Sequence, residues 1–213
     1  MLKLKLFTVN PFQQNTYLIW DSNNIAAIID PGNSTNLENQ LIKKFVSENE
    51  LKLQRLLLTH AHIDHILGNK FIFDEYGLLP EVHKDDLFFI DGMMQTASMY
   101  GVNCEESPKP EKFIEHGQTI ELGELKFNCI HTPGHSPGSI TFHLPHEKLM
   151  IAGDVLFAGS IGRTDLPMGD YDTLISSIKN SLLPLGDEIK VYSGHGPATT
   201  TGRERVSNPF LIG

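Results

Sequence analysis

One seven-residue stretch constrains this chain more than any other: residues 59–65 read Thr-His-Ala-His-Ile-Asp-His and directly follow the apolar run Leu56–Leu58. The apolar run predicts a buried strand. Its end carries side chains with metal-ligand chemistry: His60, His62, Asp64 and His65. Burying three imidazoles and a carboxylate is costly unless something pairs with them. Because histidine nitrogen and carboxylate oxygen are the ligands that zinc and similar ions take, the stretch predicts a metal site.

The spacing inside this stretch indicates that its candidate ligands point in two different directions. In an extended chain, residues i and i+2 face the same way, so His60 and His62 can hold one ion. Asp64 and His65 come after the turn, in the first turn of a helix predicted over roughly 64–77. Their side chains are expected to point elsewhere, which predicts a second ion nearby.

Three further candidate ligands each follow a predicted strand on a glycine-bearing turn: His135 after 125–130, Asp154 after 149–153, and His195 after 189–192. Open α/β sheets bind ligands at the carboxyl ends of their strands, and glycine lets the backbone turn sharply and approach an ion. Seven ligands suit two ions, with six terminal ligands and one bridge. Asp154 is the natural bridge because a carboxylate has two oxygens.

These motifs resemble the metallo-β-lactamase superfamily over nearly the whole chain. The likeness rests on Gln14-Asn15-Thr16-Tyr17, Ile29-Asp30-Pro31-Gly32, residues 60–65, Thr132-Pro133-Gly134-His135, Gly153-Asp154 and Gly194-His195-Gly196. Within it, the chain is similar to single-domain bacterial hydrolases of the hydroxyacylglutathione hydrolase (glyoxalase II) type. That finer likeness rests on residues 153–167 and on residues 202–210.

The resemblance implies a fold and a metal centre. The fold is α/β, a four-layer αβ/βα sandwich of two mixed β-sheets with helices outside. One domain is expected over 1–213, without the C-terminal helical domain of larger glyoxalase II enzymes. One metal would be held by His60, His62 and His135, and a second by Asp64, His65 and His195, with Asp154 shared. Zinc is expected, and iron or manganese would accept the same ligands.

The resemblance also makes Asp30 a residue that braces the metal-binding loop. An aspartate before Pro-Gly is equally a common turn former, so both interpretations stay open. Asp64 and Asp154 are the catalytic candidates, as the residue that orients the nucleophile through its metal and as the bridge.

The implied activity is hydrolysis of a glutathione thioester such as S-D-lactoylglutathione. A water held between two divalent ions has its pKa lowered from about 15.7 toward roughly 7, which supplies the attacking hydroxide. A thioester suits this chemistry because its thiolate leaving group, with a pKa near about 8.5, needs little protonation.

Three arginines are candidates for substrate binding. Arg163 lies in the loop after the bridging aspartate, where larger glyoxalase II enzymes place a basic residue that helps to hold glutathione; an ion pair with Asp165 or Asp170 is the alternative. Arg203 and Arg205 would add contacts or would cap the final helix. Gly196-Pro197 replace an aromatic residue of those larger enzymes, which weakens the case for glutathione.

Other functions use the same residues. A persulfide dioxygenase would hold one iron by His60 or His62 with His135 and Asp154, and shares the run 162–165. A hydrolase of another ester or a lactone would use all seven ligands. β-Lactamases of this superfamily typically carry cysteine at the position of Asp154. A non-catalytic zinc site would be closed, usually with four ligands.

The resemblance implies a small-molecule substrate, and composition argues against the alternatives of nucleic acid and a membrane span. The formal charge is −9, from 17 basic and 26 acidic side chains, and no basic arm or stripe points to nucleic acid. No apolar run approaches the roughly 18 residues of a membrane helix. The two cysteines, Cys104 and Cys129, are expected to be free thiols in a reducing cytoplasm. The sequence does not predict an oligomeric state.

Periodicity predicts the order of the elements. Strands are expected near 2–9, 15–21, 25–30, 55–59, 80–83, 119–130, 138–144, 148–152 and 189–193. Helices are expected over 64–77, 84–100 and 170–182, with a polar, proline-broken connection over 103–111.

Overall fold

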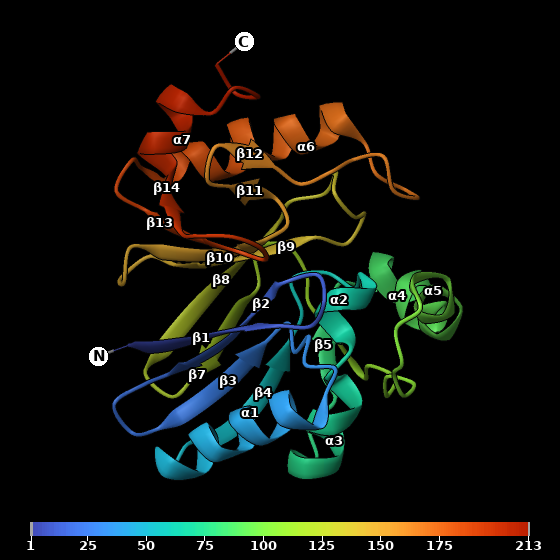
Figure 1. Cartoon of the computed structure of the whole chain (residues 1–213). Coiled ribbons are helices and arrows are strands. Elements are labelled where there is room, and N and C mark those ends of the chain that lie inside the picture. Colours follow the sequence, from blue (N-terminus) through green and yellow to red (C-terminus); the bar gives the residue numbers. More distant parts are fainter. Residues whose placement is uncertain (1, 213) are drawn as a thin grey trace.

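Two mixed six-stranded β-sheets face each other in the computed structural model, which describes residues 2–212 (Figure 1). The first sheet contains, in spatial order, β1 (Lys3–Val9), β2 (Gln14–Trp20), β3 (Ile25–Ile29), β4 (Lys52–Leu57), β5 (Pro80–Val82) and β6 (Lys112–Phe113). The second contains β14 (Thr199–Thr200), β13 (Lys190–Ser193), β10 (Leu149–Gly153), β9 (Ile140–Leu144), β8 (Leu125–His131) and β7 (Thr119–Leu122). A separate hairpin joins β11 (Leu156–Phe157) to β12 (Ser160–Ile161).

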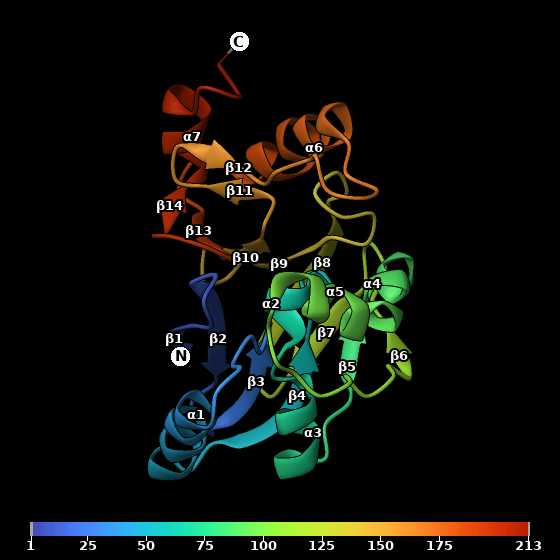
Figure 2. The ribbon, with the colours of Figure 1, turned by 45° about the vertical axis from the view of Figure 1, so that its right-hand side comes forward.

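Helices cover the outer face of each sheet (Figures 1 and 2). The first sheet is covered by α1 (Asn36–Glu48), α2 (Ile63–Ile66), α3 (Asn69–Tyr76), the 3₁₀ turn η1 (Lys84–Asp86), α4 (Leu87–Asp91) and α5 (Met93–Tyr100). The second is covered by α6 (Tyr171–Ser177), the π-helical turn η2 (Ile178–Leu182), the 3₁₀ turn η3 (Leu183–Leu185) and α7 (Thr201–Ser207). The predicted four-layer α/β sandwich is confirmed.

Alternation along the strands builds the layers. In β2, Leu18 and Trp20 pack among the helices of the first sheet, whereas Tyr17 and Ile19 face the second sheet. Successive strand residues point to opposite faces, so a strand that is buried on both sides must be apolar throughout. Phe142 of β9 is one of the large side chains between the sheets. Full burial of such a side chain stabilises the fold by about 1.5–3 kcal/mol.

Two predicted helices and one predicted strand are interrupted. The helix expected over 64–77 is the pair α2 and α3, which meet at Gly68. The helix expected over 84–100 is η1, α4 and α5, with a change of direction at Gly92. The strand expected over 119–130 is the hairpin β7–β8, which turns at Gly123 with φ +56°. Only Gly123 needs the conformational freedom of glycine, because its φ is positive; Gly68 (φ −90°) and Gly92 (φ −87°) adopt backbone conformations that other residues also adopt.

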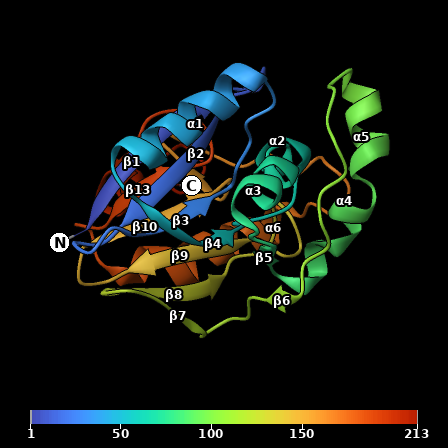
Figure 3. The ribbon, with the colours of Figure 1, turned by 90° about the horizontal axis from the view of Figure 1, so that it is seen from below.

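Helix α1 is absent from the predictions, although its start has a readable signal. Thr35 accepts a hydrogen bond from the Glu38 backbone N–H, and the Glu38 side chain binds back to the Thr35 N–H. This capping box is a sequence-level mark of a helix start. Figure 3 shows α1 and α3 side by side across the first sheet, with α4 and α5 beyond its edge.

Candidate metal centre

The two sheets meet where several of their strands end. The polar side chains of the centre follow five strand ends: Asp30 follows β3, residues 59–62 follow β4, His135 follows β8, Asp154 follows β10 and His195 follows β13. Asn15 at the start of β2 holds the last turn, because its side-chain amide donates to the carbonyls of Ser193 (3.0 Å) and Gly196 (2.9 Å). The seven predicted ligands are thereby brought to one edge of the sandwich.

His60, His62 and His135 form a group that we call the three-histidine half. His60 Nε2 lies 3.2 Å from His135 Nε2, and His62 Nδ1 lies 2.8 Å from the same atom. Three ring nitrogens therefore converge on one point from two separate loops. That is the donor set of an open zinc site, which takes three protein ligands and leaves further positions free.

Asp64, His65 and His195 form a second group, the acidic half. Asp64 Oδ2 lies 3.0 Å from His195 Nε2 and 3.6 Å from His65 Nε2. Asp64 and His65 stand in the first turn after the loop, in α2, as predicted. One carboxylate and two imidazoles give this half a different charge from the three-histidine half.

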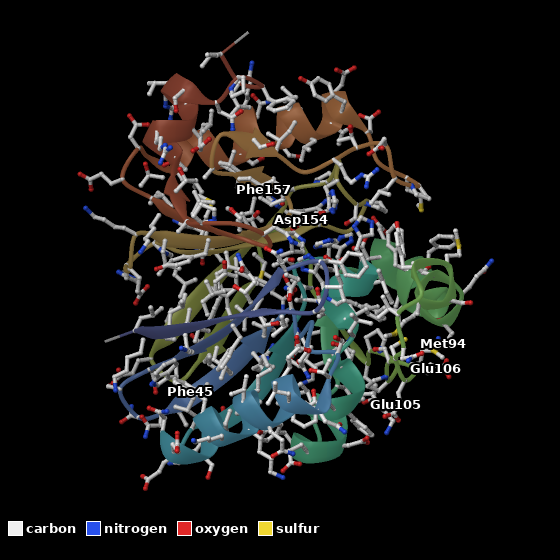
Figure 4. The ribbon with its side chains drawn as sticks, viewed as in Figure 1. Phe45, Met94, Glu105, Glu106, Asp154 and Phe157 are labelled. Carbon is white, nitrogen blue, oxygen red and sulfur yellow. The ribbon has the colours of Figure 1, made fainter. Side chains whose placement is uncertain are left out.

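Asp154 lies between the two halves, near the middle of the molecule (Figure 4). Its Oδ2 is 3.6 Å from His135 Nε2 and 3.5 Å from His195 Nε2, and its Oδ1 is 3.4 Å from His65 Nε2. Phe157, also labelled in Figure 4, packs edge-on against His195. The carboxylate of Asp154 therefore faces ligands of both halves.

The other ring nitrogen of most of these histidines is already bonded to an oxygen. The pairs are His60 with Thr59 Oγ1, His65 with Asp30, His135 with the Arg163 carbonyl and His195 with the Phe12 carbonyl. Metal-binding histidines are oriented in this way, because the second hydrogen bond fixes the tautomer and the ring.

Buried polar atoms at the centre test whether a metal fits. Among residues 2–212, His65 Nε2 and Asp154 Oδ1 are buried and have no hydrogen-bond partner. Unpaired buried groups of this kind are costly in a folded protein. Both atoms face the space between the ligands, so a divalent ion would satisfy them.

Electrostatics separate the two halves. Burial and the neighbouring His65 and His135 rings hold the pKa of His60 well below its usual value, and burial lowers the pKa of His62 to about 3. Burial also opposes the charge on His65, but the carboxylates of Asp64, Asp154 and Asp30 raise its pKa well above the usual value. His60 and His62 therefore present neutral rings, whereas the charged form of His65 is favoured.

In His195, Asp64 and Asp154, neighbouring charges also oppose the effect of burial on the pKa. Burial opposes protonation of His195, but its hydrogen bond to Asp64 and the charge of Asp154 raise its pKa. Burial opposes ionisation of Asp64 and Asp154, but the nearby His65 lowers the pKa of both carboxyl groups.

Asp30 bonds to a ligand of the acidic half. One of its oxygens accepts from the Thr59 N–H at 2.6 Å, and the other accepts from Thr59 Oγ1 at 2.6 Å and from His65 Nδ1 at 3.0 Å. Asp30 has φ +50°, a left-handed conformation that is uncommon for aspartate. Asp30 therefore forms a turn and also bonds to Thr59 and His65, so the two interpretations that the sequence left open are compatible.

Close approach of the backbone explains two of the glycines. A Cβ atom at Gly194 would lie 2.0 Å from Asp154 Oδ1 and 2.6 Å from His65 Cε1. A Cβ atom at Gly162 would lie 1.8 Å from the Asp154 carbonyl oxygen. Only glycine fits at either position without displacing the centre.

The three predicted arginines lie in different places. The Arg163 side chain is exposed and forms a two-pronged ion pair with Asp165, at 2.7 and 2.6 Å, while its carbonyl binds His135. Arg203 and Arg205 lie on α7, which begins beside Ile189 at the opposite end of β13 from His195. The structure therefore brings Arg163 to the centre and not the α7 pair, of which Arg205 binds Asp187 and the Leu183 carbonyl.

A third group of candidate ligands, His83, Asp85 and His131, lies outside the centre. The His83 and His131 rings are stacked, with centroids 4.3 Å apart and planes only 11° from parallel. Lone pairs of parallel rings do not converge on one ion, and His131 Nε2 is already bonded to the Pro137 carbonyl at 2.7 Å. We interpret this group as a contact between the ends of β5 and β8.

Sequence reasoning missed Asp86, which is buried beside the centre. Its carboxylate accepts from two backbone N–H groups and pairs with Ser136, and its burial raises its pKa. The run Lys84-Asp85-Asp86 resembles an exposed charged turn, so no local pattern marks it.

Comparison with known proteins identifies the family. The family model for the metallo-beta-lactamase superfamily matches residues 9–195. The hydroxyacylglutathione hydrolase GloC of Haemophilus influenzae is 41% identical over 212 residues, which cover 99% of this chain and 98% of that protein. The chain therefore belongs to the metallo-β-lactamase superfamily, a superfamily of metal-binding hydrolases, and the predicted resemblance is confirmed.

Two solved structures are similar over their whole length. The BLEG-1 B3 metallo-beta-lactamase superposes with a TM-score of 0.91 at 33% identity, covering 99% of this chain and 100% of that one. TTHA1623, solved in a di-iron-bound form, superposes with a TM-score of 0.87 at 36% identity, covering 97% and 100%. Among the described residues, no helix is both long and apolar enough to cross a membrane.

Proposed function

We propose that the chain is a binuclear metallohydrolase that cleaves glutathione thioesters such as S-D-lactoylglutathione. The observation that carries the proposal is the convergence of two ligand groups on the shared carboxylate of Asp154. The name of the Haemophilus influenzae relative supports the substrate class. Zinc is the proposed metal, and the di-iron form of TTHA1623 supports iron as the alternative. Cys104 and Cys129 are free thiols, which supports a cytoplasmic location.

The ligands divide the work of the centre. Bound divalent ions supply Lewis acidity and lower the pKa of coordinated water toward roughly 7. The seven side chains would hold those ions, and the five imidazoles among them would not carry protons, because a coordinated imidazole has lost its free lone pair. Asp64 would hold the ion of the acidic half, and Asp154 would hold both ions from its place between the halves. Together they would orient the nucleophile. A thiolate, with a pKa near about 8.5, leaves without a dedicated general acid, which favours a thioester over an amide.

Arg163 is the proposed contact for the glutathione part of the substrate. Its carbonyl binds His135, so its side chain starts next to the three-histidine half. The guanidinium is exposed and its partner Asp165 is exposed, so a substrate carboxylate can replace Asp165 at little cost. Arg203 and Arg205 are left out of the proposal because they lie at the other end of β13.

A β-lactam is the second candidate substrate, because BLEG-1, named as a B3 metallo-beta-lactamase, has the similarity given above. A chromogenic cephalosporin tests this candidate under the same conditions as the thioester. Oxygen uptake with glutathione persulfide tests the dioxygenase alternative. The two hydrolysis assays use zinc-loaded protein, and the oxygen-uptake assay uses iron-loaded protein.

The deciding experiment is release of free glutathione from S-D-lactoylglutathione by metal-loaded protein, with chelator-treated protein and Asp154→Asn as controls. We expect metal-dependent release, and we expect Asp154→Asn to lose bound metal and to lose at least about 100-fold in kcat/KM. Full activity in Asp154→Asn would refute the shared-carboxylate centre. No release by folded, metal-loaded protein, together with cephalosporin turnover, would keep the two-ion centre and replace the substrate. Oxygen uptake with glutathione persulfide would replace both the reaction and the two-ion centre.

A further inference from the structure

Asp86 is a fully buried carboxylate that is not among the seven ligands. It is the last residue of η1 and has no exposed surface. Its Oδ2 accepts from the Ala61 N–H at 2.9 Å and bonds to Ser136 Oγ at 2.9 Å, and its Oδ1 accepts from the Gly138 N–H at 2.6 Å. Two backbone donors thus fix both of its oxygens as acceptors.

These three partners belong to the two loops that carry the three-histidine half. Ala61 stands between His60 and His62, and Ser136 directly follows His135. One carboxylate therefore joins the backbones of two loops that lie far apart in the sequence. A Cβ atom at Gly138 would lie 2.6 Å from Asp86 Oδ1, so the second loop is shaped to approach this carboxylate closely.

We propose that Asp86 is a positioning residue that sets the spacing of the His60–His62 loop and the His135 loop, and thereby the metal affinity of the three-histidine half. The inference rests on the proposed metal centre. His62 makes the role necessary: its Nε2 is buried without a hydrogen-bond partner among residues 2–212, so its ring is not oriented in the way that the other four are. The backbone on either side of Ala61 must therefore hold it.

Asp21 provides a matched control. It too is fully buried and accepts three backbone hydrogen bonds, from Asn23, Ile25 and Glu124 at 2.8–2.9 Å. It follows β2 at the end opposite to Gln14, about 20 Å of strand away from the centre. Asp21→Asn should therefore cost stability without changing metal binding.

The test is titration of metal-free protein with Zn²⁺ in competition with a chromogenic chelator, to give the dissociation constants of both ions. We expect Asp86→Asn to weaken one of the two ions by about 10–100-fold and to leave the other unchanged. Asn retains an acceptor for Ala61 but turns an NH₂ group toward the Gly138 N–H. We therefore expect Asp86→Ala to weaken the same ion further and Ser136→Ala to weaken it less.

A double-mutant cycle assigns the affected ion. In a His60→Ala background the ion of the three-histidine half is already weakened, and Asp86→Asn should leave the dissociation constant of the remaining ion unchanged. Equal weakening of both ions, unchanged dissociation constants, or the same metal loss in Asp21→Asn would overturn the role of Asp86. If wild-type protein fails to bind two ions, the metal centre itself is wrong. If Asp86→Ala does not fold, Asp86→Asn carries the test.

Discussion

The two halves of the centre are held by the fold in different ways. In the acidic half, Asp30 bonds directly to the ligand His65, and the Phe12 carbonyl bonds directly to His195. In the three-histidine half, the corresponding carboxylate, Asp86, bonds to the backbone between and after the ligands. One half is therefore oriented ring by ring, and the other is oriented partly by the spacing of its loops.

The halves also differ in charge. Burial keeps His60 and His62 neutral, whereas the surrounding carboxylates favour the charged form of His65. Neutral ligands leave more of a bound ion's charge uncompensated than Asp64 does. The three-histidine half is thus better suited to polarise a carbonyl oxygen. If the proposed centre binds two ions, one edge of the sandwich offers them positions of unequal acidity.

The largest predicted effect comes from displacing Asp154, the carboxylate that lies between the two halves. Gly194→Ala would place a methyl group 2.0 Å from Asp154 Oδ1 and 2.6 Å from His65. We expect the shared carboxylate to be displaced, with loss of at least one bound metal and at least about 100-fold in kcat/KM. Metal analysis and steady-state kinetics measure both losses.

Gly196→Ala is the control for this substitution. Gly196 has φ +71°, and a Cβ atom there meets nothing within 4 Å. The strained backbone should cost about 1 kcal/mol of stability, while metal content stays unchanged. If the two alanine variants bind metal equally well, the close approach at Gly194 does not matter for the centre.

How far the sequence predicts this centre depends on whether the interacting residues are close together or far apart in the sequence. The ligands are predictable because each follows an apolar strand on a short turn, so local pattern and strand-end geometry suffice. Asp86 is not predictable, because its partners Ala61 and Ser136 are distant in sequence and only the fold brings them to it. The breaks at Gly68 and Gly92 are also tertiary, since a single glycine within a helical pattern does not specify a break.

The position of Arg205 illustrates the same limit. Its sequence neighbourhood made it a candidate for substrate binding, but α7 begins at the far end of β13. The conspicuous Glu204 and Asn208 of that segment instead bind the β11–β12 hairpin, through the Gly159 N–H and the Ser160 carbonyl. The tail of this chain therefore supports the hairpin that leads from Asp154 toward Arg163.

An intermediate effect is expected from pH. In the metal-free protein the pKa values of His65 and His195 are raised, so these rings stay protonated to higher pH and must lose protons to bind metal. His60 and His62 have lowered pKa values and are already neutral. From about pH 5.5 to 8, the Zn²⁺ affinity of the acidic half should rise by up to about tenfold per pH unit for each proton that must be released. The Zn²⁺ affinity of the three-histidine half should rise much less.

Calorimetric Zn²⁺ titrations in buffers of different ionisation enthalpy measure the protons released with each ion. The ion that His60→Ala weakens should release few protons, and the other ion should release more. Equal proton release by the two ions would contradict the difference in charge between the halves.

The smallest effect sharpens the account of how His62 is held. The Phe89 ring packs edge-on against the His62 ring, with centroids 4.7 Å apart. Such a contact contributes about 0.5–1.5 kcal/mol, so Phe89→Leu should weaken the ion of the three-histidine half by roughly 2- to 10-fold. Phe73→Leu, at an exposed ring on α3, is the control and should leave both dissociation constants unchanged. If Phe89→Leu has no effect, loop spacing alone orients His62.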